Sequence, residues 1–222
     1  MTTPTTAPTK ESQRLFIAVP LPDSLKRLIG AWTRDIRTSF PFRKWTDEAD
    51  LHVTLQFLGD TAPVLIPELK AALASAAGSG RIQPFTLSLR DTRTFGRPGQ
   101  PSVLWAGIGG ELEQLHSLQR MIVEATAPLG FAAEKRPYSP HLTIARKYTG
   151  KDEFSPPELL RADHSSDLLA NGPGHNSDDS TQPQAYDNVK DPLSWQVDEI
   201  VLYRTHMHQR QMYEAAARFA LR

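Results

Sequence analysis

The chain has 222 residues, a formal net charge of zero and no cysteine. That length is enough for the core of one domain or of two small packed lobes. The absence of cysteine excludes a disulfide framework and a thiolate nucleophile. No apolar run approaches the roughly 20 residues that span a bilayer, and the first residues lack the order of a signal peptide. We therefore expect a cytoplasmic protein that does not contact a membrane.

The zero net charge hides an uneven distribution. Residues 150–199 contain eleven acidic and three basic side chains, a net charge of −8, so the rest of the chain carries +8. A basic body attracts anions, although salt screens this field over short distances. The charge pattern therefore favours a phosphate-bearing ligand only slightly.

Two segments are predicted to lack regular structure. Residues 1–12 are rich in Thr and Pro and read as a disordered tail. Residues 154–192 are polar, acidic and interrupted by Pro and Gly, a composition that buries too little apolar surface to fold. We interpret the second segment as a disordered surface insertion within a single two-lobed domain at 13–222.

The rest of the sequence predicts a regular order of strands and helices. Apolar runs of strand length and apolar residues at helical spacing predict, in chain order, a strand at 14–20, a helix from Asp23 (as its N-cap) to 36, a strand at 51–58, a helix at 67–77, strands at 85–90 and 102–108, a helix at 112–126, and strands at 140–146 and 197–204. The last segment, 213–221, is ambiguous, because its alanines favour a helix and its place in the order favours a closing strand.

The order strand, helix, strand occurs twice with the same length. His52 follows Phe16 by 36 residues, and His141 follows Trp105 by 36 residues. Each histidine begins a His-x-Thr-apolar sequence, HVTL in the first copy and HLTI in the second. The repeat predicts two related lobes, each of which contributes one His-x-Thr strand.

Two such strands suit proton transfer at a phosphate. Side chains at i and i+2 of a strand share a face, so His52 projects with Thr54, and His141 with Thr143. Across a pseudo-twofold cleft, one imidazole can deprotonate an attacking water while the other protonates the leaving oxygen. The two hydroxyls can hold the non-bridging phosphoryl oxygens, and this chemistry needs no metal and no cofactor.

The pattern alone leaves other roles open. A strand histidine is often structural, and two such histidines support a structural and a catalytic interpretation about equally. A non-catalytic nucleotide-binding module could also use two histidines and two threonines to hold a phosphate. Two titratable groups favour catalysis, because a pure binder does not need them.

Several segments resemble the 2H phosphoesterase superfamily, and within it the bacterial RNA 2′,3′-cyclic phosphodiesterases, also called 2′-5′ RNA ligases (the LigT group). The resemblance covers residues 13–148 and 195–221 and rests on QRLFIAVPLP, LHVTLQFLGD, SVLWAGI, RPYSPHLTIAR and LYRT. It implies an α+β fold of two pseudo-symmetric lobes, each an antiparallel sheet with helices outside, that meet at a central cleft.

The resemblance also implies an activity. The expected enzyme is a metal-independent phosphoric diester hydrolase that converts a 2′,3′-cyclic phosphate end of RNA to a 2′-phosphate, with 2′-5′ ligation as the reverse chemistry. The alternative substrate is another small cyclic or ADP-ribose-derived phosphate. The expected partner is an RNA end or a small nucleotide, with no protein partner implied, and the expected state is a monomer.

By motif order, the resemblance assigns His52 as the proton donor to the leaving O3′ and His141 as the base that activates water. Thr54 and Thr143 would hold the phosphoryl oxygens. A pseudo-symmetric pair could exchange the acid and base roles, so the sequence leaves that assignment open.

The resemblance suggests four substrate-binding residues as well. Arg146 matches an arginine found after the second motif, but it lies five residues after His141, and at this odd offset it faces away unless a bulge or the strand end reorients it. Arg136 and Tyr138 are candidates to contact the terminal nucleotide. Phe16 offers a ring for base stacking, or else is a core residue of its strand.

Overall fold

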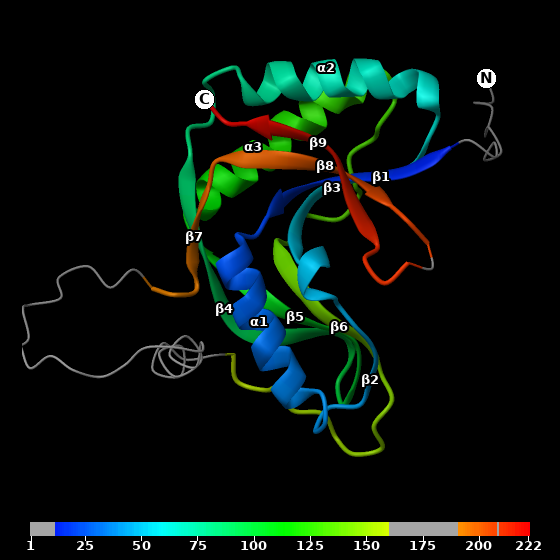
Figure 1. Cartoon of the computed structure of the whole chain (residues 1–222), viewed down its shortest axis with the longest axis vertical. Helices are drawn as coiled ribbons and strands as arrows, with labels where there is room; N and C mark the ends of the chain where they lie inside the picture. Colours follow the sequence, from blue (N-terminus) through cyan, green and yellow to red (C-terminus); the bar gives the residue numbers. More distant parts are fainter. Residues whose placement is uncertain (1–11, 160–190, 208) are drawn as a thin grey trace, which may run out of the picture.

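The computed structural model describes residues 12–159 and 191–222 with the exception of residue 208. Within these residues, nine strands form one antiparallel sheet, and three α-helices pack outside it (Figure 1). None of the helices described is long and apolar enough to cross a membrane.

The elements of the structure follow in chain order. The strands are β1 (Gln13–Pro20), β2 (Phe42–Trp45), β3 (His52–Thr61), β4 (Phe85–Arg97), β5 (Gln100–Gly110), β6 (His141–Tyr148), β7 (Ser194–Val197), β8 (Glu199–Thr205) and β9 (Tyr213–Ala220). The helices are α1 (Asp23–Ile36), α2 (Ile66–Ala77) and α3 (Leu112–Thr126), with short 3-10 turns η1 (Glu48–Asp50), η2 (Pro63–Leu65) and η3 (Ala127–Leu129).

The strand order divides the sheet into two matching lobes. The order is β7-β4-β5-β6-β3-β1-β8-β9, and β2 pairs with β6 outside this path. We call β3, β1, β8 and β9 the β1 lobe, and β6, β5, β4 and β7 the β5 lobe. The His-x-Thr strands β3 and β6 are the innermost strand of each lobe, and they are joined by the pairing of Val53 with Leu142.

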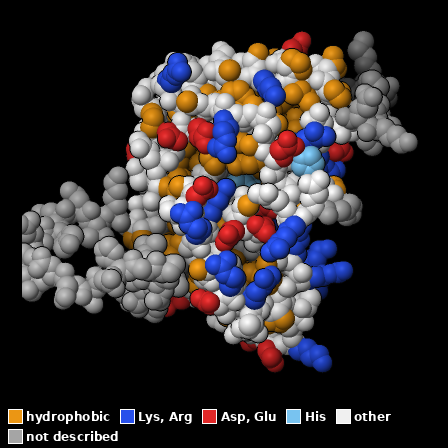
Figure 2. All heavy atoms as spheres, viewed as in Figure 1, with side chains coloured by type: hydrophobic (Ala, Val, Ile, Leu, Met, Phe, Trp, Pro, Cys, Tyr) orange, Lys and Arg blue, Asp and Glu red, His pale blue; other side chains and the backbone are white. Residues whose placement is uncertain are grey.

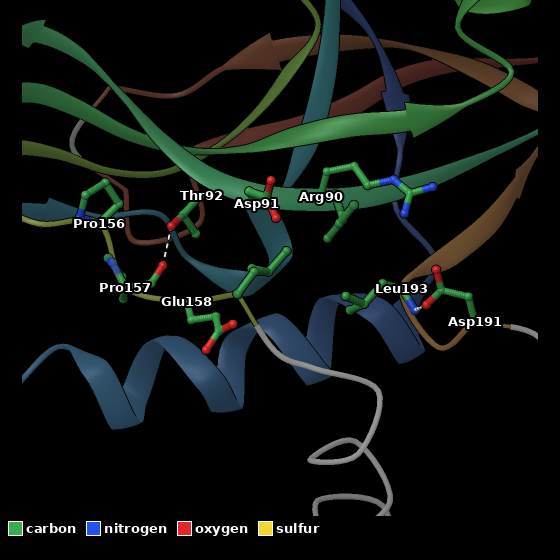
Figure 3. Close-up of a pocket in the computed structure, with 10 residues that line it drawn as sticks. Arg90, Asp91, Thr92, Pro156, Pro157, Glu158, Asp191 and Leu193 are labelled. Atoms are coloured by element: carbon green, nitrogen blue, oxygen red, sulfur yellow. Dashed lines mark hydrogen bonds between the residues drawn. The ribbon is translucent and has the colours of Figure 1, made fainter.

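Each helix that follows a central strand packs on the opposite lobe. Helix α1 follows β1 but lies beside β4 of the β5 lobe (Figures 1 and 3). Helix α3 follows β5 but contacts β3 and α2 in the β1 lobe, and α2 also contacts β9. The buried apolar residues of both lobes form one continuous core.

The structure corrects some of the predicted elements. Helix α1 begins at Asp23 itself, its cap residue is Pro22, and no side chain caps it, so the predicted N-cap is wrong. The ambiguous last segment is strand β9, because its pairing with β8 outweighs the helix propensity of its alanines. The four-residue strands β2 and β7 were not predicted, since they are too short to show a period.

The predicted tail at 1–12 and insertion at 154–192 lie mostly outside the described residues. At the edge of the insertion, the ring of Phe154 packs against the rings of Phe40, Phe42 and Tyr148. Leu159 is also buried. Packed chain therefore extends several residues past the predicted start of the insertion.

Candidate functional site

A cleft of about 1460 Å³ opens where β3 and β6 meet. His52 and Thr54 of β3 and His141 and Thr143 of β6 line it, together with Arg146. Each of the four motif side chains is half-buried, and the residues between them face the core. The structure thus brings both His-x-Thr pairs to one cavity.

The two histidines are held in the same way. Nδ1 of His52 lies 2.7 Å from the carbonyl oxygen of Asp50, and Nδ1 of His141 lies 2.8 Å from the carbonyl oxygen of Ser139. A carbonyl oxygen only accepts hydrogen bonds, so each Nδ1 carries the proton and donates it. Each Nε2 is therefore free to take or give a proton in the cleft.

Aromatic side chains form a wall beside each histidine. The ring of His52 lies 4.7 Å from that of Phe16 and 5.1 Å from that of Tyr213. The ring of His141 lies 5.1 Å from that of Phe95 and 5.8 Å from that of Trp105. The aromatic residue 36 positions before each histidine thus packs against it, which gives the repeat in the sequence a physical basis.

These walls lower the pKa of both histidines. Burial is the main cause of a pKa of about 4 for His52, and the positive charge of Arg146 acts in the same direction. Burial also lowers the pKa of His141, again with a contribution from Arg146. Both imidazoles are therefore mostly neutral at pH 7, and a bound anion would raise both pKa values.

A β-bulge follows the threonine of each motif. In β3, Ala18 pairs with Thr54 but Ile17 pairs with Gln56, so Leu55 is an extra residue. In β6 the register shifts in the same way just after Thr143. Because each bulge puts two buried residues in succession, the fifth residue after each histidine turns back toward solvent.

The bulges place Arg146 and Phe57 at the cleft. Arg146 is the fifth residue after His141, and its guanidinium donates to Oγ1 of Thr143 over 3.4 Å. Phe57 is the fifth residue after His52, and its ring is 58% exposed. Both line the cavity. By strict alternation, Arg146 would face away from His141. The one extra residue of the bulge turns its side chain to the same face as the histidine.

Asp50 connects His52 to the hairpin between β8 and β9. Its side chain is 5% exposed, and its two carboxylate oxygens accept hydrogen bonds from the backbone N–H groups of Met212 (3.0 Å) and Tyr213 (3.1 Å). Burial raises the pKa of this carboxyl group, and the two backbone donors oppose that shift. Tyr213 packs edge-on against His52. Asp50 therefore fixes His52 in two ways, through its own carbonyl oxygen on Nδ1 and through the position of Tyr213.

Three predicted substrate-binding residues lie elsewhere. Phe16 is 3% exposed, with its ring packed against His52, Tyr203 and Tyr213, so of the two roles expected for it, base stacking and a core position, the structure places it in the core behind the histidine. The hydroxyl of Tyr138 donates to the Thr54 carbonyl over 3.0 Å and ties the segment before β6 to β3. Arg136 is exposed and lies outside the cleft lining.

Some cleft residues escaped the sequence interpretation. The sequence did contain an indication of Phe57, because Phe57 follows His52 by the same number of residues as Arg146 follows His141. Nothing in the sequence pointed to Asp50, Lys44 or Tyr213, which reach the cavity from the turn η1, from β2 and from the start of β9. Within the part of the chain that the structure describes, no cluster of three or more His, Asp or Glu is arranged to hold a metal.

A second cavity of about 620 Å³ lies away from the histidines. Figure 3 shows it between β4, the segment Pro156–Leu159 and the residues before β7. The hydroxyl of Thr92 donates to the Pro157 carbonyl at its edge. Its described lining contains charged and apolar side chains without a histidine, so the larger cleft is the candidate active site.

Comparison with known proteins agrees with this geometry. The sequence model of the 2'-5' RNA ligase superfamily matches residues 21–171. The chain belongs to this superfamily. Its membership confirms the family and the two-lobed α+β fold that the sequence resemblance implies.

Individual relatives and a solved structure match most of the chain. An RNA 2′,3′-cyclic phosphodiesterase of Geobacillus stearothermophilus is 36% identical over 206 residues, which cover 93% of this chain and 56% of the relative. One of Bacillus subtilis (strain 168) is 30% identical over 208 residues, covering 93% of this chain and 95% of the relative. The crystal structure of Escherichia coli LigT with 3′-AMP has a TM-score of 0.65 at 27% identity and covers 95% of this chain and 99% of that chain.

Proposed function

We propose that this protein hydrolyses the 2′,3′-cyclic phosphate at the end of an RNA to a 2′-phosphate. The observation that carries the proposal is the pair of histidines in one cleft, each with Nδ1 bound to a backbone carbonyl and Nε2 free. The names of the relatives, RNA 2′,3′-cyclic phosphodiesterase, support the substrate.

In the proposed reaction, Nε2 of His141 takes a proton from water while the water oxygen attacks phosphorus. The bond from phosphorus to O3′ breaks, and Nε2 of His52 gives its proton to that oxygen. The reaction consumes one water and leaves the 2′-phosphate and a free 3′-hydroxyl. This assignment of acid and base follows the order of the motifs.

Three side chains would hold the reacting phosphate. Thr54 and Thr143 can donate their hydroxyls to the non-bridging oxygens, and Arg146 beside Thr143 adds a positive charge. With a pKa of about 4, His52 has no proton on Nε2 to give at pH 7. The bound anion raises that pKa, so that His52 takes up the proton that it then gives to O3′.

The test is hydrolysis of a short RNA ending in a 2′,3′-cyclic phosphate, in EDTA, followed by phosphorus NMR. We expect a 2′-phosphate product, and we expect His52→Gln and His141→Gln each to lower kcat by about 10² to 10⁴-fold. His116→Gln on α3, outside the cleft lining, is the matched control and should retain activity.

Three outcomes would contradict the proposal in different ways. A 3′-phosphate product would show that O2′ leaves, and the role of His52 would then be wrong. Tight binding of the RNA without turnover would support the non-catalytic nucleotide-binding module. Activity that EDTA abolishes would contradict a mechanism that relies on the two histidines alone.

A further inference from the structure

Two basic side chains stand directly opposite each other in the wall of the cleft. In the antiparallel pairing of β2 with β6, Lys44 is the partner of Arg146. Both side chains are exposed, and both line the cavity. Like charges opposite each other on two strands repel and destabilise the pair, so this arrangement favours an anion between or beside them.

Two other cations of the cleft have carboxylate partners. Arg34 lies 3.2 Å from a carboxylate oxygen of Glu48, and Arg210 lies 3.6 Å from one of Asp47. Among the described residues, no carboxylate lies within ion-pair distance of Lys44; its ammonium lies 2.9 Å from the thioether sulfur of Met212, a weak acceptor. Lys44 therefore offers a positive charge that no carboxylate of the described residues neutralises.

The cleft also continues past the histidines along β2. Its lining includes Trp45 and Arg37, and the Arg37 guanidinium lies 5.8 Å from the centre of the Trp45 ring. Figure 2 shows several Lys and Arg side chains on this face around α1 and β2, with acidic side chains among them. The volume of about 1460 Å³ exceeds the roughly 300–1,000 Å³ of ordinary small-molecule sites, so the cleft has room for more than one nucleotide.

We propose that Lys44 binds the phosphodiester on the 5′ side of the terminal nucleotide, so that the cleft recognises the end of an RNA chain in preference to a free cyclic mononucleotide. The inference rests on the proposed function, in which Arg146 and Thr143 hold the reacting phosphate. A cyclic mononucleotide has one phosphate and leaves Lys44 without an anion. A chain has a second phosphate next to the first, as Lys44 is next to Arg146.

The experiment compares two substrates, 2′,3′-cyclic AMP and the dinucleotide ApA that ends in a 2′,3′-cyclic phosphate. We expect the wild-type kcat/KM to be higher for the dinucleotide. Lys44→Met keeps the aliphatic stem and removes the charge, and should lower the ratio of the two kcat/KM values about tenfold. Lys44→Arg should restore most of that ratio.

Arg43 provides the matched control. It is the exposed neighbour of Lys44 on β2 but does not line the cleft, so Arg43→Met should leave both kcat/KM values unchanged. The salt dependence gives a second readout. For longer single-stranded substrates, loss of one phosphate contact should reduce the slope of log K against log salt by about 0.7 in Lys44→Met and leave it unchanged in Arg43→Met.

An equal loss on both substrates in Lys44→Met would show that Lys44 binds the reacting phosphate, and unchanged kcat/KM values for both substrates would show that it binds no phosphate. Either result overturns the inference while hydrolysis itself stands. If the wild type hydrolyses neither substrate, the proposed function fails. In that case, calorimetric titration with the mono- and dinucleotide 2′-phosphates still compares Lys44→Met with the wild type. A selective loss for the dinucleotide would support the Lys44 site, and no selective loss would overturn it.

Discussion

At the scale of single residues, the cleft depends on backbone groups to orient its histidines. Asp50 provides a carbonyl oxygen for Nδ1 of His52 and a carboxylate for the N–H groups of Met212 and Tyr213. A buried carboxylate that accepts two backbone donors is costly to replace, because each donor would be left without a partner. These hydrogen bonds make Asp50 a positioning residue for His52.

We expect Asp50→Asn to lower the free energy of unfolding by about 1–3 kcal/mol, because the amide nitrogen faces a backbone N–H that needs an acceptor. The same change should shift the pH profile of kcat/KM, since the wall around His52 would loosen. Urea unfolding and the pH profile measure the two effects. Asp60→Asn, at an exposed ion pair with Arg14, is the control and should change stability by no more than about 1 kcal/mol. An unshifted profile would contradict the positioning role.

A second expectation concerns pH. Burial lowers the pKa of His52 to about 4 and lowers that of His141 below its ordinary value. The pH dependence of kcat/KM reports the pKa values of the free enzyme, so this bell-shaped curve should be centred below pH 6.5. On its alkaline side, kcat/KM should fall as pH rises, because the proton donor loses its proton. Bound phosphate raises both pKa values, so the bell for kcat should lie at higher pH. Initial rates across pH 4–9 test this, and coincident bells for the two parameters would contradict it.

At the scale of elements, the two bulges decide which side chains reach the cleft. The sequence predicts the strands and the faces of both His-x-Thr pairs, because strict alternation holds from the histidine to the threonine. The sequence does not predict the face of Arg146, because a bulge is a change in the pairing between two strands and cannot be seen in one strand alone. A single strand carries no information about register with a neighbour that is distant in the sequence.

The joint between β3 and β6 is also an element-scale feature. It consists of the Val53–Leu142 pairing and the hydrogen bond from the Tyr138 hydroxyl to the Thr54 carbonyl. We expect Tyr138→Phe to lower the free energy of unfolding by about 1 kcal/mol and to reduce kcat/KM, because the two motif strands would be less firmly joined.

Urea unfolding and steady-state kinetics measure both effects in Tyr138→Phe. Tyr148→Phe is the matched control, since its hydroxyl donates to an exposed carbonyl over 3.5 Å, and it should change neither quantity appreciably. If the two variants behave alike, the Tyr138 hydroxyl does not stabilise the joint.

At the scale of the whole molecule, the helix crossings tie the lobes together. Helix α1 leaves the β1 lobe to lie beside β4, and α3 leaves the β5 lobe to contact β3. The buried cores of the two lobes are continuous. The sequence predicted two lobes from its repeat, but not which lobe each helix covers, because helix periodicity identifies an apolar face and not its partner.

We therefore expect the two lobes to unfold in one transition. The tryptophans all report the β5 lobe, since Trp105 and Trp195 lie in its strands, Trp45 pairs with β6 and Trp32 lies on α1. Leu202→Ala makes a cavity in β8 of the β1 lobe and should lower the free energy of unfolding by about 2–5 kcal/mol.

In Leu202→Ala, the urea midpoint of tryptophan fluorescence, which reports the β5 lobe, should fall. It should coincide with the urea concentration at which the amide groups of β1 and β8 lose their protection from hydrogen exchange. A fluorescence midpoint that Leu202→Ala does not move would show that the lobes unfold independently. The wild-type chain, followed by the same two methods, provides the reference midpoint.

The fifth position after each histidine gives the cleft a direction. The histidines and threonines are repeated on both sides, so by themselves they would accept a substrate in two opposite orientations. Phe57 and Arg146 break that equivalence, with an apolar ring on one side and a cation on the other. We therefore expect a ligand with a flat base at one end and a charged phosphate at the other to enter in one orientation only, and this asymmetry would give the two histidines different roles in the proposed reaction.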